Sequence, residues 1–262
     1  MVTKTNKTQE GVVMAEKDQY LTLENGVKCI FKAYGHKYVV NNKKLIGVST
    51  ILDMLHKEHL VKWKIREAIK NIKDELERHL PDDKIQQVLD DAENKAKTKM
   101  TKILSIGKIV HSYIEKYVKG EKYIEPEDPV VLKCFEEFKD WWQENGFTLI
   151  ASEKIVCIPD AFAGTIDLVA KDKEGLVWLI DIKTNNGIFV SHFHQVHGYK
   201  YAYEKQTGKK INRMCIVRLP KDGSKIEVRR VLSKKQHMLA FMGLLSALKS
   251  VKLFKKQTIK YN

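Results

Sequence analysis

Cysteine is scarce in this sequence, and its spacing excludes several classes of protein. The chain has 262 residues and only 4 cysteines. No two of them form a Cys-x-x-Cys pair, the spacing typical of structural zinc sites and many iron–sulfur clusters, so neither is expected. Isolated cysteines also fit a reducing compartment better than a disulfide-bonded secreted domain. They stand at Cys29, Cys134, Cys157 and Cys215.

Proline and long apolar runs are also few. With 5 prolines, no proline-rich linker and no internal repeat, the chain is expected to form one compact domain with an added helical region. No apolar run approaches the ~18–20 residues that span a membrane. The first residues match neither a signal peptide nor an arginine-rich transit peptide. We therefore expect a cytoplasmic protein that has no membrane partner.

Acidic residues are outnumbered by basic ones. Lys and Arg total 47 against 33 Asp and Glu, which gives a net charge of +14. A surplus of this size favours a polyanionic partner, and nucleic acid ranks first because no basic amphipathic membrane anchor stands out. Charge alone does not identify the partner. The hydrophobic content of 43% is ample for a folded core.

The N-terminal part divides into a polar arm and a mixed region. Residues 1–18 lack periodicity and are expected to be a flexible arm. Residues 19–102 are expected to hold a β-hairpin and a helical elaboration. The hairpin would turn at Asn41-Asn42, since asparagine tolerates positive φ. Helices are expected over residues 50–80, with a break near residues 56–59, and again after a Pro81 stop with Asp82 or Asp83 as cap. The lysine-rich face at residues 95–102 is either solvated or lines a DNA path.

Residues 103–250 are expected to form the core, followed by a basic tail at 251–262. Hydrophobic periodicity and cap residues predict its elements. They are a helix at 102–119, a helix from Asp128 to Gly146, strands at 147–158, 164–170 and 176–183, a helix ending at Thr207-Gly208, strands at 211–219 and 225–231, and a last helix to about Ser250.

Two charged residues interrupt the apolar strand at 176–183. Asp181 and Lys183 are two residues apart, so both side chains lie on one face of the strand. Asp167, on the neighbouring strand, can reach the same face. Buried charges cost several kcal/mol each without compensation. Either Asp181 and Lys183 form a structural ion pair, or Asp167 and Asp181 hold a metal and Lys183 faces a phosphate or a water.

Two helices carry polar pairs at i and i+4, the spacing that stacks side chains on one face. They are His111 with Glu115, and Gln195 with Tyr199. A histidine on an apolar helix face is more often a core residue than a ligand, and Gln195 and Tyr199 can equally be packing residues. Three further histidines either add metal or phosphate contacts or are polar surface. Polar surface is the more common case, so they are left out of the site: His192, His194 and His197.

Taken in order, these positions resemble a known family. The motifs are Gly107-x-x-x-His111-x-x-Ile114-Glu115, Gly164-x-x-Asp167, Asp181-x-Lys183 and Gln195-x-x-x-Tyr199. Together they resemble the RecB-type branch of the PD-(D/E)xK nuclease superfamily, which includes the mitochondrial genome maintenance exonuclease and phage exonucleases. The resemblance covers about residues 36 to 205. It implies an α/β, restriction-endonuclease-like fold: a mixed β-sheet core in αβββαβ order, flanked by helices.

The resemblance also implies a Mg²⁺ or Mn²⁺ site. Asp167 and Asp181 would supply the hard oxygen ligands that these ions prefer. His111 would add a nitrogen ligand, and the Ile182 carbonyl would complete the set. The branch with an iron–sulfur cluster has a cysteine set that this chain lacks, so no cluster is expected.

Four further residues receive roles from the resemblance. Lys183 would orient or deprotonate the attacking water, or stabilise charge on the phosphate. Glu115 would bind a second metal through water or orient His111. Gln195 and Tyr199 would contact the phosphate backbone or the Asp181 strand.

One alternative motif is rejected. Pro159-Asp160 is a literal Pro-Asp pair upstream of Asp181, but it falls in a turn, whereas Asp167 lies within a strand beside the Asp181 strand.

The function implied is a metal-dependent DNA exonuclease that leaves 5′-phosphates, in DNA recombination, repair or replication of a phage or bacterium. A structure-specific or flap endonuclease has the same motifs, and a non-catalytic nucleic-acid-binding module is the alternative outside enzymes. The expected partners are single- or double-stranded DNA ends and recombination proteins of a phage or its host. The expected location is the cytoplasm of a bacterial or phage-infected cell.

Overall fold

The computed structural model describes residues 18–55, 58–76 and 85–258. Three predictions fall outside these ranges: almost all of the expected N-terminal arm, the helix stop at Pro81, and the caps at Asp82 or Asp83. The last residues of the expected basic tail also lie outside them.

A mixed six-stranded sheet forms the centre of the molecule, so the α/β class is confirmed. Its strand order is β10-β9-β8-β7-β5, and β6 pairs with the other side of β7. The β5–β7 and β8–β9 pairs are parallel, and the others are antiparallel. Its strands are β5 (Ile46–Gly47), β6 (Thr148–Ile158), β7 (Phe162–Lys171), β8 (Val177–Lys183), β9 (Arg213–Arg218) and β10 (Glu227–Val231).

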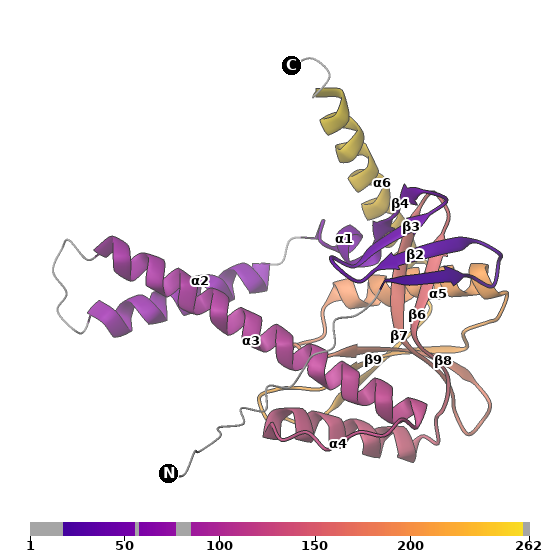
Figure 1. The fold of residues 1–262 in the computed structure, drawn as a ribbon, viewed down its shortest axis with the longest axis horizontal. Helices are drawn as coiled ribbons and strands as arrows, with labels where there is room; N and C mark the ends of the chain where they lie inside the picture. Colours follow the sequence, from indigo (N-terminus) through magenta and orange to yellow (C-terminus); the bar gives the residue numbers. More distant parts are fainter. Residues whose placement is uncertain (1–17, 56–57, 77–84, 259–262) are drawn as a thin grey trace, which may run out of the picture.

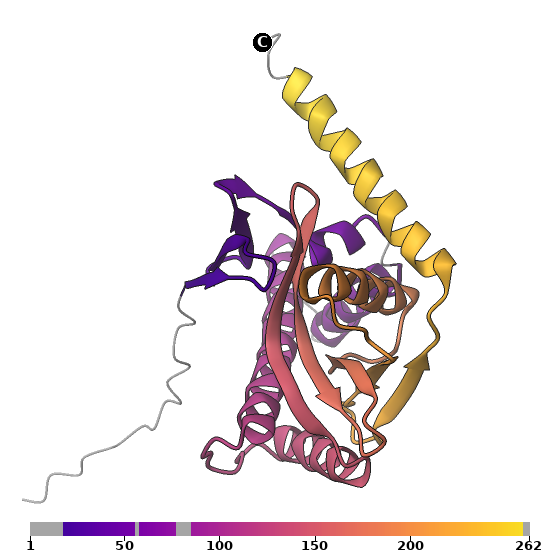
Figure 2. The same ribbon diagram turned by 90° about the vertical axis from the view of Figure 1, so that its right-hand side faces the viewer.

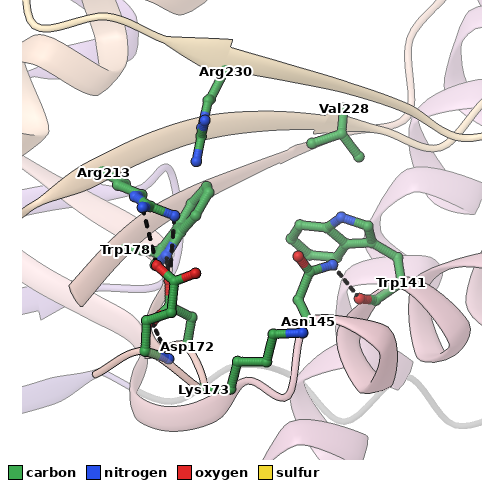
Figure 3. Close-up of a pocket in the computed structure, with 9 residues that line it drawn as sticks. Trp141, Asn145, Asp172, Lys173, Trp178, Arg213, Val228 and Arg230 are labelled. Carbon is green, nitrogen blue, oxygen red and sulfur yellow. Dashed lines mark hydrogen bonds and ion pairs between the residues drawn. The ribbon is translucent and has the colours of Figure 1, made fainter. Parts of the chain in front are cut away.

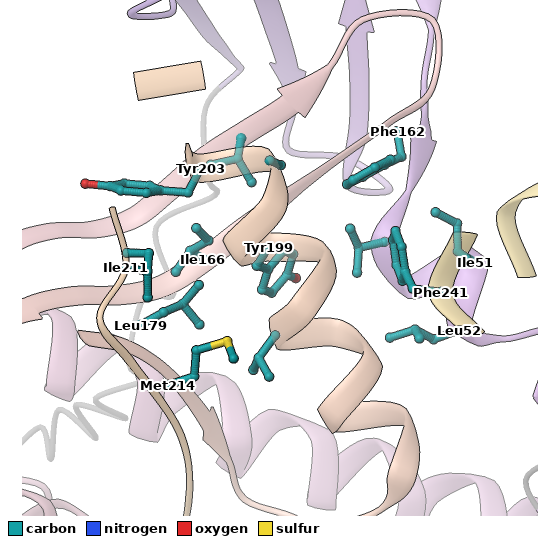
Figure 4. Packing of buried hydrophobic residues seen from close by; sticks show 14 of the residues in the cluster. Ile51, Leu52, Phe162, Ile166, Leu179, Tyr199, Tyr203, Ile211, Met214 and Phe241 are labelled. Atoms are coloured by element: carbon teal, nitrogen blue, oxygen red, sulfur yellow. The ribbon is translucent and has the colours of Figure 1, made fainter. Parts of the chain in front are cut away.

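Helices cover both faces of this sheet (Figures 1 and 2). One face packs against α3 (Ile85–Lys119) and α4 (Pro129–Glu144). The other packs against α1 (Val48–Leu52), α5 (Val190–Thr207) and α6 (Lys235–Thr258), and Figure 4 shows that layer from close by. Strand β8 is therefore buried on both sides, as its apolar run predicted. Alternate residues serve the two layers: Trp178, Ile180 and Ile182 against α3 and α4, and Leu179 against α5.

A smaller antiparallel sheet precedes the core. Its strands are β1 (Gln19–Thr22), β2 (Lys28–Lys32), β3 (Lys37–Val40) and β4 (Lys43–Lys44), paired in that order. The predicted hairpin turn at Asn41-Asn42 is confirmed, with φ values of 49° and 61°. Such positive φ is a conformation that asparagine tolerates better than most residues. The buried side of this sheet packs against β6 and β7 through Ile155, Cys157 and Ala163.

Helices α2 (Glu58–Leu76) and α3 pack together as an arm that projects from the body (Figure 1). Residues 102–119, predicted as a helix of the core, are the C-terminal half of α3, which is continuous from Ile85 to Lys119. That stretch has no proline, and its one glycine, Gly107, lies inside the helix. The boundary drawn at residue 102 therefore falls within a helix that joins the arm to the core.

Several helix ends follow the predicted chemistry. Asp128 caps α4, because its Oδ1 accepts hydrogen bonds from the Val130 and Val131 amides at 2.8 and 3.2 Å. Gly208 ends α5 with a φ of 69°, in the left-handed region that favours glycine.

The last helix is longer than expected. It was predicted to end near Ser250 but continues to Thr258, and its C-terminal half extends away from the body (Figure 2). By length and composition it also passes the test for a membrane span, with a mean hydropathy of 1.3 over Lys235–Phe254. One such helix is weak evidence for a membrane span, and 11% of this window is buried inside the structure.

Candidate metal and catalytic site

The candidate site lies where one edge of β7 changes partners. That edge pairs with β8 from Leu168 to Lys171, and with β5 at Phe162 and Ala163. Asp167 lies between the two pairings, where β8 turns away. Its Oδ2 accepts a hydrogen bond from the Ile182 amide at 2.6 Å. The carboxylate thus replaces a strand partner for that amide, and it ties the motif on β7 to the motif on β8.

Asp181 is a buried carboxylate beside a buried ammonium group. Its side chain is 1% exposed, and Lys183 Nζ lies 2.7 Å from its Oδ2. The two groups form an ion pair without the alignment of a hydrogen bond. Within the described part of the chain, neither Asp181 oxygen has a hydrogen-bond partner. Buried carboxylates normally have such partners, so this one requires another source of compensation.

The pKa values of this pair reflect burial and neighbouring charge. Burial raises the pKa of Asp181 to about 7; the Lys183 charge opposes that rise and the Asp167 charge adds to it. For Lys183, burial lowers the pKa, but the carboxylates of Asp181 and Asp167 outweigh it and the net shift is upward. Lys183 is therefore a cation at neutral pH.

His111 lies beside these carboxylates and belongs to the helix layer on the other face of the sheet from α5. It lies on α3, and its Nδ1 is 4.0 Å from Asp167 Oδ1. Burial lowers its pKa, with a smaller opposing contribution from Asp167. The ring is accordingly neutral at physiological pH, which is the form that binds metals.

Glu153 also lies beside His111 and Asp167, although the sequence did not predict it as a site residue. Donor atoms of His111, Glu153 and Asp167 all lie within 4.8 Å of one another. On β6 the paired residues Ser152↔Leu168 and Lys154↔Ile166 flank Glu153, which puts it level with Asp167. Its φ of 46° is unusual for a non-glycine residue in a strand and strains the backbone by about 1–3 kcal/mol. No signal in the sequence marks this residue, because register across the β6–β7 pair and a positive φ are not readable from composition.

The donor atoms present could hold a divalent metal ion, without specifying which one. Three carboxylates supply hard oxygen donors and His111 supplies a neutral imidazole. His111, Glu153 and Asp167 would hold the ion, with Asp181 and the Ile182 carbonyl beside them. A cation near Asp181 would also compensate its buried, unpartnered oxygens.

Glu115 is the predicted site residue that these contacts leave out. Its carboxylate pairs with Lys119 one turn further along α3. No contact among the described residues joins Glu115 to His111, Asp167 or Asp181. The i, i+4 spacing to His111 therefore brings the two onto one helix face without a shared interaction.

Tyr199 is buried in the core layer beneath α5 (Figure 4), whereas Gln195 is half-buried. Gln195 Nε2 donates a hydrogen bond to Tyr199 Oη at 3.1 Å. The pKa of Tyr199 is raised well above its usual value by burial, and further by the charges of Asp181 and Asp167. The hydroxyl is thus protonated and electrostatically coupled to the carboxylates. The ring packs in the core, in line with the alternative that Tyr199 is a packing residue.

The two motif glycines, Gly107 and Gly164, lie where a side chain would collide with residues that surround the candidate site. A Cβ on Gly107 would lie 2.7 Å from Thr184 Oγ1, so its absence lets α3 approach the end of β8. A Cβ on Gly164 would lie 2.6 Å from Tyr199 Cε1 and 2.9 Å from Val48 Cγ2.

Gly164→Ala is expected to destabilise the protein by about 1–3 kcal/mol, because the added methyl group overpacks a fully buried contact. Urea denaturation measures this. Gly243→Ala is the matched control: no described atom would meet its Cβ within 4 Å, and it lies in an exposed position of α6. There alanine should stabilise by roughly 0.5–1 kcal/mol. Shifts of the same sign in both variants would contradict the packing explanation.

The prediction that His192, His194 and His197 are polar surface was wrong. All three are buried, with exposures of 8%, 8% and 4%. His197 Nδ1 donates to the Phe193 carbonyl at 2.7 Å, and its Nε2 accepts from the Lys234 amide at 3.1 Å. This bridge fastens α5 to the start of α6, and His194 lies against His237 there.

Acid should weaken this fastening. Burial lowers the pKa of His197, so the folded protein holds the neutral ring. A lowered histidine pKa gives stability that is present above about pH 6.5 and lost as the pH falls below it. His197→Asn should therefore reduce the loss of unfolding free energy between pH 8 and pH 5.5 by about 1 kcal/mol. His36→Asn supplies the control, since His36 is exposed and takes no part in this bridge; equal effects of the two substitutions would refute this role.

Asp160 lies in the turn before β7, as expected. It has a φ of 58°, is 74% exposed at its side chain, and pairs with Lys43 at 3.2 Å. No described contact connects it to the group around Asp167.

The comparisons with known proteins add little. A scan against protein-family models finds no match, and no curated protein matches. A solved structure titled "Crystal structure of SSO0001" is similar over 47% of this chain and 62% of that chain, with 12% identity and a TM-score of 0.29. The match therefore spans less than two thirds of that protein, and at this TM-score it supports no conclusion about fold or function.

Proposed function

We propose that this protein is a metal-dependent deoxyribonuclease of the PD-(D/E)xK type that hydrolyses phosphodiester bonds. One observation carries the proposal. The buried Asp181 and Lys183 lie close to Asp167 and His111, at the point where β8 turns away from β7. The succession of α3 and α4, then β6, β7 and β8, then α5 and β9, supports the same proposal. So does the net charge of +14, which suits a polyanionic substrate.

In this proposal, His111, Glu153, Asp167 and Asp181 bind the divalent ion. When bound, the ion supplies Lewis-acid polarisation of the phosphate and lowers the pKa of a coordinated water. The water oxygen bonds to phosphorus and the bond to the 3′ oxygen breaks. A 5′-phosphate and a 3′-hydroxyl result, with the water proton ending on the leaving oxygen.

Lys183 acts as a charge stabiliser. Its pKa is raised by Asp181 and Asp167, so the ammonium group keeps its proton at neutral pH. A protonated lysine cannot deprotonate water, but it stabilises the negative charge that develops on the phosphate. Tyr199, also protonated, keeps its hydroxyl as a donor near the carboxylates.

The arm of α2 and α3 provides a surface for DNA beside the site. α3 carries His111 in its core portion and exposed lysines further out, including Lys99, Lys102 and Lys108. Such side chains bind the phosphate backbone without reading sequence. We favour an exonuclease because the motifs resemble exonucleases of the RecB-type branch. An endonuclease with the same site is the second candidate.

The experiment compares end-labelled linear DNA with covalently closed circular DNA, each single- and double-stranded, in Mg²⁺, Mn²⁺ or EDTA. Metal-dependent loss of linear DNA alone is expected. Cleavage of closed circles would overturn the exonuclease proposal in favour of an endonuclease. Salt-sensitive binding without cleavage of any substrate would overturn the enzyme proposal and leave a nucleic-acid-binding module.

A further inference from the structure

A cavity lies at the turn end of the β7–β8 hairpin, away from the candidate site. Its volume is about 320 Å³, and it lies between the end of α4, the β7–β8 turn and strands β9 and β10 (Figure 3). That volume is at the lower end of the range for small-ligand sites. Asp172 borders the cavity, and Asp167 lies at the candidate site. Along a strand the path between them is roughly 16 Å, so the two sites are separate.

Two indole rings form part of its lining. Trp178 is buried, and its Nε1 donates to Asp172 Oδ2 at 2.7 Å. Trp141 is half-buried; its ring contacts Phe138 and Phe147 and still borders the cavity. Figure 3 shows Trp141 on the side away from Arg213 and Trp178. A half-buried indole beside a cavity is a platform on which a nucleobase can stack.

Of the two arginines that line the cavity, Arg213 is paired with carboxylates and Arg230 is not. Arg213 is engaged by two carboxylates, with NH1 3.6 Å from Asp172 Oδ2 and NH2 3.2 Å from Glu174 Oε2. Arg230 is exposed and lies 5.4 Å from the centre of the Trp178 ring. Among the residues that the structure describes, the Arg230 side chain takes part in no ion pair and no hydrogen bond, and its contact is with the Trp178 ring. The exposed Lys173 adds a second cation, so an anion can bind here without displacing an existing partner.

We propose that this cavity binds one nucleotide of a single-stranded DNA chain. The base stacks on Trp141, and Arg230 and Lys173 bind the phosphate. Asp172 does not repel it strongly, since its carboxylate is already held by Trp178 Nε1, the Leu176 and Glu174 amides and Arg213. The inference rests on the proposed function only in taking DNA as the ligand.

The position of the cavity sets a length requirement. A single strand that occupies both sites must span a path of roughly 16 Å, which takes several nucleotides. A strand with one end at the candidate site therefore reaches the cavity only when it is at least that long. Shorter oligonucleotides should bind with lower affinity and should not respond to changes in the cavity.

The test measures binding without cleavage. The Asp181→Asn protein in EDTA is titrated with a fluorescein-labelled long oligothymidylate, and affinity is read by anisotropy and by quenching of tryptophan fluorescence. Adding Arg230→Gln is expected to weaken binding about tenfold. Arg229→Gln is the matched control, because the adjacent residue on β10 points to the other face and pairs with Glu227 at 2.8 Å. It removes the same charge and should weaken binding less than about twofold.

A second variant and a competitor sharpen the result. Trp141→Leu should abolish most of the tryptophan quenching and weaken binding, provided that circular dichroism shows a folded protein. Equal effects of Arg230→Gln and Arg229→Gln would overturn the cavity assignment, as would equal competition by an acidic peptide. Cleavage of linear DNA by the single Arg230→Gln variant is measured in parallel. If cleavage persists while the two arginine variants bind alike, only the cavity proposal fails; if no variant binds or cleaves DNA, the proposed function fails.

Discussion

Asp181→Asn is expected to lower the rate of DNA cleavage by about a thousandfold or more, since it removes one of the carboxylates proposed to hold the divalent ion that polarises the phosphate. Rates on end-labelled linear DNA in Mg²⁺ and Mn²⁺ measure this. The matched control is Asp160→Asn, the same change in the exposed Pro159-Asp160 turn, which pairs with Lys43. Its activity should be unchanged. Loss of activity in Asp160→Asn with activity retained in Asp181→Asn would mean that the site lies around the other motif.

The same substitution should change how the free energy of unfolding depends on pH, which a simple loss of packing would not do. Burial raises the pKa of Asp181 to about 7, so the folded protein retains a proton that the unfolded chain releases. The metal-free protein therefore loses stability as the pH rises from about 4 through 7, and Asn does not titrate. In EDTA, the unfolding free energy of the native protein should therefore fall between pH 5 and pH 8, and that of Asp181→Asn should fall less. Mn²⁺ should raise the melting temperature of the native protein more than that of the variant.

Lys183→Met is expected to lower cleavage by about 10²–10⁴-fold while the response to metal is retained. The ligand set does not include Lys183, so Mn²⁺ should still raise the melting temperature. Removing the ammonium group leaves Asp181 buried beside no cation, which should destabilise the metal-free protein by about 3–5 kcal/mol. Mn²⁺ should recover part of that loss.

Lys209→Met supplies the control for Lys183→Met. It removes the same charge from an exposed loop position after α5, and neither activity nor stability should change. Rates that fall equally in both variants would mean that Lys183 contributes only to the general positive field. A loss of the Mn²⁺ response in Lys183→Met would instead mean that Lys183 is needed to hold the metal ligands in place.

The sequence by itself determined the elements and the order of the polar positions. The apolar run of β8 indicated burial on both faces, and the Asn41-Asn42 turn, the Asp128 cap and the Gly208 stop all follow from local conformational preferences. Period-two spacing placed Asp181 and Lys183 together, which the structure gives as an ion pair at 2.7 Å. These features were accessible because each depends on residues close in the chain.

Tertiary structure decided the membership of the site. Glu153 lies level with Asp167 only through the register of β6 on β7, and its backbone takes a φ of 46° that no local pattern encodes. Glu115 has the right helical spacing but pairs with Lys119. His197 was predicted to lie on the surface, but it is buried where α6 packs against α5. Local spacing fixes which side chains share a face, whereas the partner that face meets depends on strand register and helix packing between residues far apart in the chain.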